Sequence, residues 1–328
     1  MRVLTDPMHR RTLVSVVAAI ALTASATTAS AADRPRLNAT GYAMAGSAQP
    51  SDITRDGGYL RTIGIDGVTL DGPDRITPVT RDAHRLRRTA QKHGRQAVLL
   101  VSNYTDELGD FDEPLAHRML TSPARRAAVV ASLARAARSF DGVQIDLESL
   151  KARDTAGLVA FTRELRAAVP GRSVSMAVMA STNARGYRAR GYDLAALTPS
   201  LDRIVLMAYD QHGPWSGSGP IGSLPWVRKQ LAYVASVVPD HKIDLGVAAY
   251  GYQWGGGAET VTVPQARKKA GTRAHWSAKH GEWTAKLPAG RRIWWSDRRS
   301  LAAREKIARR AGVHGVAIWQ IGSSGRLR

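Results

Sequence analysis

The sequence contains no cysteine among its 328 residues. This absence excludes a disulfide scaffold, a cysteine-ligated zinc site, an iron–sulfur cluster and a thiol nucleophile. The nine histidines are scattered without the spacing of metal ligands, so we expect neither a metal ion nor another cofactor. Hydrophobic residues make up 44% of the chain, which is ordinary for a packed core and argues against global disorder.

Acidic residues are scarce relative to basic ones, and long apolar runs are lacking. The 47 lysines and arginines outnumber the 27 acids, which gives a formal net charge of +20. Such a charge points to a polyanionic partner: nucleic acid, an anionic membrane or an acidic wall polymer. The apolar run at residues 12–22 has about eleven residues, whereas a transmembrane helix needs ~20.

The first 31 residues instead have the pattern of a secretory signal peptide. Arg10 and Arg11 precede the apolar run, and Ala29-Ser30-Ala31 supplies an A-x-A cleavage site before Ala32. We therefore expect a secreted, extracellular protein without a transmembrane span after cleavage, which retains a charge of 44 − 26 = +18. Export disfavours nucleic acid as the partner and favours adhesion to an anionic cell-wall polymer.

The mature chain, residues 32–328, alternates β-rich runs with helical stretches. This alternation predicts βα units and a parallel sheet. Eight runs match an α/β fold of the (β/α)8 TIM barrel type, although a doubly wound open sheet is an alternative. No G-x-G-x-x-G motif follows the first run, so the sequence lacks the dinucleotide-binding signal that is usual for the open sheet. The runs lie at residues 37–46, 60–70, 96–104, 140–148, 173–180, 203–210, 242–251 and 315–321.

The connection between the seventh and eighth runs is the longest. Residues 255–296 hold Gly255-Gly256-Gly257, several short strand-like pieces and many of the tryptophans. We expect a small α+β insertion at the rim of the barrel. No separate wall-binding module is recognisable, so we expect the barrel and this insertion to provide any binding of a polymer.

Candidate catalytic residues lie on the fourth run. Residues 140–150 read F-D-G-V-Q-I-D-L-E-S-L, and the period of two puts Gln144, Asp146 and Glu148 on one face. Glu148 falls at the carboxyl end of the strand, where barrel active sites are built. Two neighbouring carboxylates do not both ionise freely, which favours a protonated Glu148 that acts as a general acid. The alternative is that these acids form salt bridges inside the barrel.

The D-G-x-x-x-D-x-E pattern of this run resembles glycoside hydrolase family 18, which includes chitinases and endo-β-N-acetylglucosaminidases. Met207-Ala208-Tyr209-Asp210 resembles the family's M-x-Y-D on the sixth strand, and Trp319 resembles the tryptophan of the eighth. Within the family the sequence is most similar to the spore-cortex and cell-wall hydrolase branch. That similarity rests on Y-D-Q-H at 209–212, G-P-I-G-S-L-P-W-V at 219–227 and Y-G-Y-Q-W at 250–254.

The resemblance implies a retaining hydrolysis in which the 2-acetamido group of the substrate is the nucleophile. Glu148 is then the general acid and base, Asp146 orients the acetamido group, and Tyr209 donates a hydrogen bond to its carbonyl. Trp319 forms the floor of the sugar subsite by stacking on the ring. The other substrate-binding candidates are Gln144, Asp210, Met207, Tyr250 and Trp254.

One position departs from the commonest family pattern, and several alternatives stay open. Many chitinases carry an aspartate where this chain has Gln144, so we expect Gln144 to hydrogen-bond Asp146 and the pH dependence to be shifted. Asn103 and Tyr104 end the third run and could reach the groove. A catalytically inactive, carbohydrate-binding protein on the same barrel is the alternative function. The N-acetylglucosamine-containing polysaccharide itself, peptidoglycan, chitin or an N-glycan core, is not distinguished.

Overall fold

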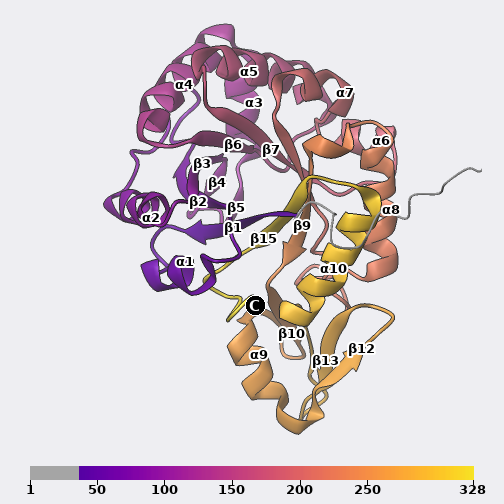
Figure 1. Ribbon diagram of the computed structural model, residues 1–328. Helices are drawn as coiled ribbons and strands as arrows, with labels where there is room; N and C mark the ends of the chain where they lie inside the picture. Colours follow the sequence, from indigo (N-terminus) through magenta and orange to yellow (C-terminus); the bar gives the residue numbers. More distant parts are fainter. Residues whose placement is uncertain (1–36) are drawn as a thin grey trace, which may run out of the picture. The chain divides into compact units, whose positions relative to one another are not determined.

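A computed structural model describes residues 37–328, and the predicted signal peptide lies outside the described residues. Eight parallel strands form a closed barrel in the order β1-β15-β9-β8-β7-β6-β3-β2 (Figure 1). Pairing of β1 with β15 closes the barrel, which confirms the TIM barrel and excludes the open sheet. The barrel strands are β1 (Asn38–Met44), β2 (Thr62–Thr69), β3 (Gln96–Ser102), β6 (Gly142–Asp146), β7 (Ser173–Met179), β8 (Arg203–Met207), β9 (Ile243–Ala248) and β15 (Gly315–Trp319).

Helices follow most of the barrel strands and begin at residues suited to capping. Thr80 accepts a hydrogen bond from the Ala83 amide at the start of α2, and Asp297 caps α10 in the same way. Within residues 37–328, none of the helices is long and apolar enough to cross a membrane. The helices are α1 (Pro50–Asp56), α2 (Arg81–Lys92), α3 (Glu113–Thr121), α4 (Pro123–Ala136), α5 (Thr155–Ala168), α6 (Ala184–Ala189), α7 (Leu194–Leu197), α8 (Leu224–Ala235), α9 (Val263–Ala270) and α10 (Arg298–Ala311).

The barrel strands bury side chains on both faces. Val143, Ile145 and Leu147 belong to the large cluster between barrel and helices, as the period of β6 predicts. A smaller cluster fills the barrel interior and consists of Tyr42, Leu100, Val205 and Ala317, with Trp319 packed against it. A Cβ at Gly64 would lie 2.4 Å from the Tyr42 ring, so glycine is needed there for Tyr42 to reach across the barrel.

The insertion is a five-stranded antiparallel sheet in the order β11-β10-β14-β13-β12, with α9 packed against it. Its strands are β10 (Tyr250–Trp254), β11 (Ala258–Thr262), β12 (His275–Ser277), β13 (Glu282–Lys286) and β14 (Arg292–Trp295). The sheet therefore begins at Tyr250, earlier than the expected residue 255, and residues 250–254 do not extend the seventh barrel strand. The reason is a change of partner: β9 pairs in parallel with β15, whereas β10 pairs antiparallel with β11 and β14.

A buried ion pair joins the insertion to the barrel. Arg304 of α10 and Glu282 of β13 are 2.6 Å apart, and their side chains are 1% and 0% exposed. The Glu282 carboxylate also accepts the backbone amides of Ile221 at 2.7 Å and Gly222 at 2.8 Å. Because a buried carboxylate is stable only when its oxygens are satisfied, these contacts fix the insertion beside the loop that follows β8.

Candidate active site

The backbone around Glu148 is held by two buried side chains. Asp146 is the last residue of β6, and Glu148 lies two residues beyond it at the carboxyl end of the strand. The Asn103 side chain accepts the Glu148 amide at 2.9 Å and donates to its carbonyl at 3.1 Å. The Tyr192 hydroxyl donates to the Leu147 carbonyl at 2.9 Å. The loop that carries Glu148 is therefore positioned by its backbone, which leaves the carboxyl side chain available.

Asn103, one of two residues that could have reached the groove, does not do so, because its side chain is fully buried. An amide can both donate and accept, so Asn103 satisfies the two backbone groups of Glu148 that no strand partner supplies. Tyr104, in contrast, is 40% exposed. It lies in the short hairpin of β4 (Tyr104–Thr105) and β5 (Asp110–Phe111), where its ring contacts Phe111.

The two carboxyl groups are strongly perturbed. Burial raises the pKa of Glu148 well above its usual range, and the nearby charges of Asp146, Asp210 and Asp110 add to the effect. Burial also raises the pKa of Asp146 to about 7, with a further contribution from Asp66. A Glu148 that keeps its proton near neutral pH is suited to general acid catalysis, as the sequence led us to expect.

Tyr209 follows β8 and lies beside the carboxyl pair. Burial raises the pKa of its hydroxyl well above the usual range, and Asp146 adds to the effect, so Tyr209 stays a hydrogen-bond donor. Its ring contacts Tyr250, with 6.5 Å between the ring centroids. A Cβ at Gly246 would lie 3.0 Å from the Tyr209 ring and 2.4 Å from the Leu206 carbonyl, so glycine makes room for this ring.

Asp210 is bound by two tyrosines of the insertion. Its Oδ1 accepts hydrogen bonds from Tyr250 and, at 3.0 Å, from Tyr252. Burial raises the pKa of Asp210, and the two tyrosine hydrogen bonds oppose that change. The side chains of Tyr250, Tyr252 and Trp254 form consecutive edge contacts, which confirms that they share one face. Trp254 is 8% exposed and donates to the Gly213 and Ser216 carbonyls, so it also holds the loop after β8.

Trp319 is the last residue of β15 and reaches the same region from the other side. Its ring lies 5.4 Å from that of Tyr42, and it packs against the aromatic cluster that includes Tyr250 and Tyr252. Met207, the last residue of β8, is 8% exposed. The predicted aromatic residues thus lie in one cluster, of which Tyr209 is beside Asp146 and Glu148. Their contacts with sugar remain predictions.

Gln144 occupies the barrel interior but does not have the predicted partner. Its Oε1 accepts hydrogen bonds from the Tyr42 hydroxyl at 2.9 Å and from the Ser175 hydroxyl at 3.2 Å. The predicted hydrogen bond between Gln144 and Asp146 is not formed. The reason is that Tyr42 extends across the barrel from β1, a contact between residues 102 positions apart. Within the described residues, Asp146 Oδ1 is buried without a hydrogen-bond partner.

The sequence analysis missed one carboxyl group, that of Asp66 on β2. Asp66 has the same strand phase as Gly64, which faces the interior, whereas Ile63 and Ile65 face the helices. Burial raises its pKa, and its charge acts on Asp146. A single acid on the inward face of an otherwise apolar strand is the signal that could have revealed it.

A pH–rate profile tests this coupling. We expect Asp66→Asn to lower the pKa of Asp146, because the substitution removes a negative charge that disfavours its ionisation. Asp146 then stays ionised to lower pH, and the acidic limb of the profile of kcat/KM moves toward lower pH. Gln144→Asp adds a negative charge and is expected to move that limb the other way. Superimposable profiles of Asp66→Asn and the unsubstituted protein would show that Asp66 has no electrostatic role.

A cavity lies at the opposite end of the barrel. It has a volume of about 530 Å³ and is lined by the first residues of the strands, including Asn38, Ser173, Arg203 and Asp244. Barrel enzymes build their active sites at the carboxyl ends of the strands. We therefore place the active site at Glu148 rather than in this cavity.

Glu113, His117 and Asp154 form a cluster whose ligand atoms lie within 4.8 Å of one another. These groups already have protein partners. Glu113 pairs with Lys151 at 3.0 Å and with Arg153 at 2.6 Å, and Asp154 accepts from His117 at 2.5 Å. The cluster joins α3 to the loop after β6, and its contacts explain it as a structural ion-pair network.

A closed barrel with two neighbouring carboxyl groups at the carboxyl end of its fourth strand is the arrangement of a barrel glycosidase. The model of the glycosyl hydrolases family 18 matches residues 78–323. The chain belongs to this family.

Relatives include both cell-wall enzymes and chitinases. The chain is 23% identical to the uncharacterized glycosylase YvbX of Bacillus subtilis, over 86% of this chain and 87% of that protein. It is 26% identical to the cortical fragment-lytic enzyme of B. subtilis, over 73% of this chain and 60% of the relative. The fold is similar to that of the Bacillus cereus spore cortex-lytic enzyme SleL, with a TM-score of 0.80 at 17% identity, over 89% and 72% of the two chains. A Chromobacterium violaceum chitinase gives a TM-score of 0.80 at 22% identity, over 89% and 96%.

Proposed function

We propose that the protein is a secreted hydrolase that cleaves β-1,4 linkages of N-acetylglucosamine-containing glycans with retention of configuration. The observation that carries this proposal is the position of Asp146 and Glu148 at the carboxyl end of β6, where burial and the nearby charge of Asp146 raise the pKa of Glu148. Family membership supports the reaction class. The raised pKa of Glu148 and the substrate-assisted chemistry of the family thus both indicate Glu148 as the general acid.

The proposed reaction has two steps. Glu148 donates its proton to the glycosidic oxygen, the bond from that oxygen to C1 breaks, and the acetamido oxygen of the same sugar bonds to C1. Asp146 stabilises the positive charge of the resulting oxazolinium ring, and Tyr209 donates a hydrogen bond to the acetamido oxygen. Glu148, now a carboxylate, takes a proton from water as that water attacks C1 and reopens the ring.

Peptidoglycan is the substrate that we favour. The names of two relatives, the cortical fragment-lytic enzyme and the cortex-lytic enzyme SleL, refer to spore cortex, and the motifs at 209–212, 219–227 and 250–254 resemble that branch. We further propose export, on the pattern of residues 1–31. Amino-terminal sequencing of protein from culture medium checks this, since a start other than Ala32 contradicts the predicted cleavage.

Mass spectrometry of reaction products tests the proposed function. We expect purified peptidoglycan to yield fragments that end in reducing N-acetylglucosamine, and chitin oligomers to be cleaved more slowly. A chemically de-N-acetylated substrate is expected to resist cleavage, because it lacks the nucleophile. Faster cleavage of chitin oligomers than of peptidoglycan would make chitin the favoured substrate. Cleavage of the de-N-acetylated glycan would overturn the substrate-assisted mechanism. Absence of any cleavage would favour the carbohydrate-binding alternative.

A further inference from the structure

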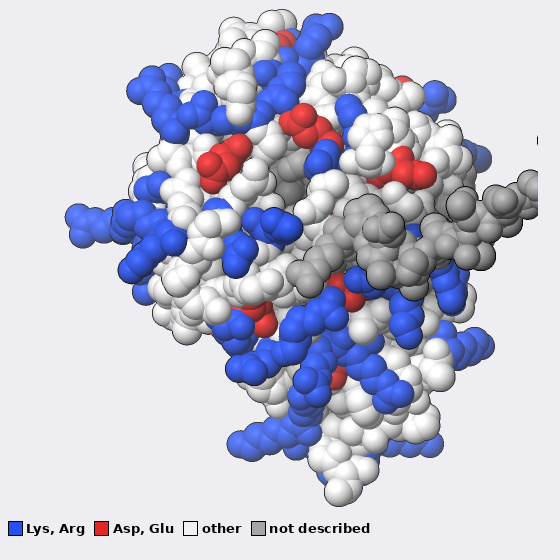
Figure 2. All heavy atoms as spheres, viewed as in Figure 1, with Lys and Arg blue, Asp and Glu red and all other residues white. Residues whose placement is uncertain are grey.

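The positive charge is concentrated in the last part of the chain. Residues 255–328 contain 16 lysines and arginines but only 4 acids, a net charge of +12. Residues 37–254, three times as long, contain 26 and 21, a net charge of +5. Figure 2 shows Lys and Arg side chains over much of the lower part of the visible face, where Figure 1 places α9, α10 and the second sheet. The basicity is therefore a local property of this part of the structure.

The four acidic residues of segment 255–328 neutralise little of its positive surface charge. Glu282, Asp297 and Glu305 are buried, and each is already paired with an arginine. Glu259 is exposed and pairs with Lys269. Glu305 also lies 3.8 Å from Arg309. Most of the other lysines and arginines of this part have no acidic partner among residues 37–328, so the exposed charge here is mainly positive.

Three of these arginines line a cavity. The cavity has a volume of about 400 Å³ and lies where the starts of α9 and α10 meet the carboxyl-terminal tail. Arg298 and Arg326 have no acidic partner among residues 37–328, whereas Arg267 pairs with Asp297 at 2.6 Å. The lining consists of Val263, Pro264, Arg267, Arg298, Ser324, Gly325 and Arg326, without an acidic or aromatic side chain.

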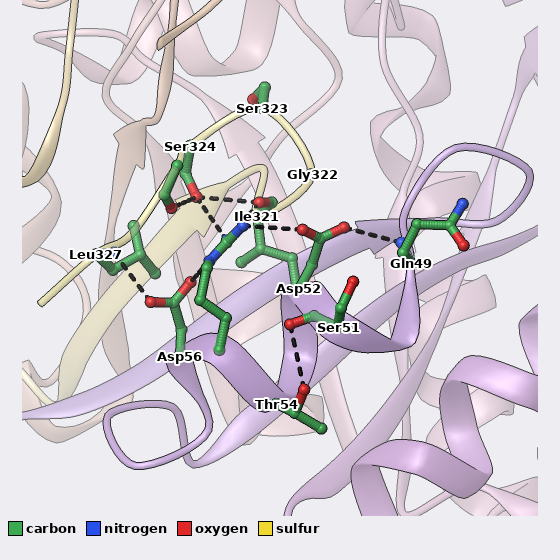
Figure 3. Close-up of polar contacts among 12 residues, drawn as sticks. Gln49, Ser51, Asp52, Thr54, Asp56, Ile321, Gly322, Ser323, Ser324 and Leu327 are labelled. Atoms are coloured by element: carbon green, nitrogen blue, oxygen red, sulfur yellow. Dashed lines mark hydrogen bonds and ion pairs between the residues drawn. The ribbon is translucent and has the colours of Figure 1, made fainter. Parts of the chain in front are cut away.

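The tail that carries Arg326 is fixed on both sides of that residue (Figure 3). The Leu327 amide donates to Asp56 at 2.9 Å. Arg55 of α1 donates to the Ser324 hydroxyl at 3.1 Å and is itself paired with Asp56. Because this backbone is ordered before any ligand binds, the entropy cost of assembling the three guanidinium groups around an anion is reduced.

The cavity and the active site lie on different sides of the second sheet. Val263 and Ala266 of α9 pack with Trp295 in one cluster. Trp294, the neighbouring residue on β14, packs in the other cluster, which includes Tyr250 and extends to Tyr209 and Trp319. Since adjacent strand residues face opposite ways, α9, which carries Arg267, covers the face remote from that of Tyr250 and Tyr209. A ligand in the cavity therefore leaves the catalytic groove open.

We propose that the cavity formed by Arg267, Arg298 and Arg326 binds a phosphate group of a phosphodiester-linked polyanion, and that the surrounding basic surface binds further phosphates of the same polymer. Guanidinium groups bind phosphate oxygens in pairs, and several of them together give a strong site. A nucleic acid is disfavoured because single strands are normally held by stacking on aromatic side chains, which this lining lacks. Binding at this cavity does not depend on the proposed hydrolytic reaction.

Binding of poly(glycerol phosphate) to the mature chain tests the proposal. We expect the double variant Arg298→Gln/Arg326→Gln to bind this polymer roughly tenfold more weakly and with a shallower dependence on salt, because two phosphate contacts are lost. The control is Arg88→Gln/Arg163→Gln, which removes the same charge from exposed positions on α2 and α5 and is expected to change affinity less than about twofold. Thermal unfolding verifies that both variants are folded.

Three outcomes would overturn the proposal. Equal losses in the two double variants would show that binding follows total charge rather than the cavity. Equal affinity for poly-glutamate would remove the phosphate preference, and tighter binding of single-stranded DNA would make nucleic acid the partner. Hydrolysis of a neutral N-acetylglucosamine oligomer is expected to be unchanged in both variants, so a failure of this proposal is distinguishable from a failure of the proposed function.

Discussion

Replacement of Glu148 by Gln is expected to lower kcat/KM about a thousandfold for an N-acetylglucosamine oligomer, because the proton donor for the leaving oxygen is lost. The amide keeps the size of the side chain but does not ionise. An aryl glycoside whose leaving group departs without protonation is expected to lose less in kcat/KM. Steady-state kinetics with both substrates check the size of the effect and its dependence on the leaving group.

The structure provides a control for this substitution. Glu107→Gln changes an exposed residue in the nearby β4–β5 hairpin and is expected to leave the rates unchanged. Asn103 holds the backbone of Glu148, not its carboxyl group, so the Glu148→Gln variant is expected to unfold at the same temperature as the unsubstituted protein. Equal kcat/KM values for the variant and the unsubstituted protein would eliminate Glu148 as the acid.

Glu282→Gln is expected to lower the free energy of unfolding by about 3 kcal/mol or more, because it leaves the buried Arg304 without a counter-charge. Arg304 keeps its hydrogen bonds to the carbonyls of Gly281 and Ser300, which limits the loss but does not neutralise the guanidinium. Urea-induced unfolding, followed by circular dichroism, measures the change. We expect the insertion and α10 to be affected first, since this pair joins them.

A matched exposed pair serves as the control. Glu259 and Lys269 are 54% and 38% exposed, so Glu259→Gln is expected to cost less than about 1 kcal/mol. Indistinguishable unfolding midpoints for Glu282→Gln and the unsubstituted protein would mean that the hydrogen bonds alone hold the junction. A loss of the same size in Glu259→Gln would show that burial does not decide the effect.

The fold and the catalytic pair could be predicted because their signals are local. Alternating strand and helix patterns predict βα units, and eight of them match a (β/α)8 barrel, although only the pairing of β1 with β15 excludes the open sheet. On β6, the period of two separates the inward Asp146 from the outward Ile145 without knowledge of the rest of the chain. Burial then raises the pKa of the inward carboxyls, as their position alone suggests.

The other features depend on partners that are distant in sequence. Tyr250–Trp254 continues the period of the preceding strand, and only pairing with β11 and β14 reveals that it belongs to another sheet. Gln144 accepts a hydrogen bond from Tyr42 on the other side of the barrel and does not bond to the neighbouring Asp146. The position of Asn103 at the end of a strand left a place at the groove open, whereas its side chain is buried and hydrogen-bonded to the backbone of Glu148. These strand pairings and side-chain partners are determined by tertiary contacts, which cannot be read from a local sequence pattern.

The closure of the barrel has a consequence for the order of folding. Strand β1 pairs with β15, with Asn38 opposite Gly315, and the Leu327 amide bonds to Asp56. Until the last residues of the chain are available, β1 and β9 each have an edge without its native neighbour. Contacts of such long sequence separation form slowly, because a long loop must close before they stabilise the chain. A polypeptide that completes its barrel with its final strand closes that barrel only after its last residues have been synthesised.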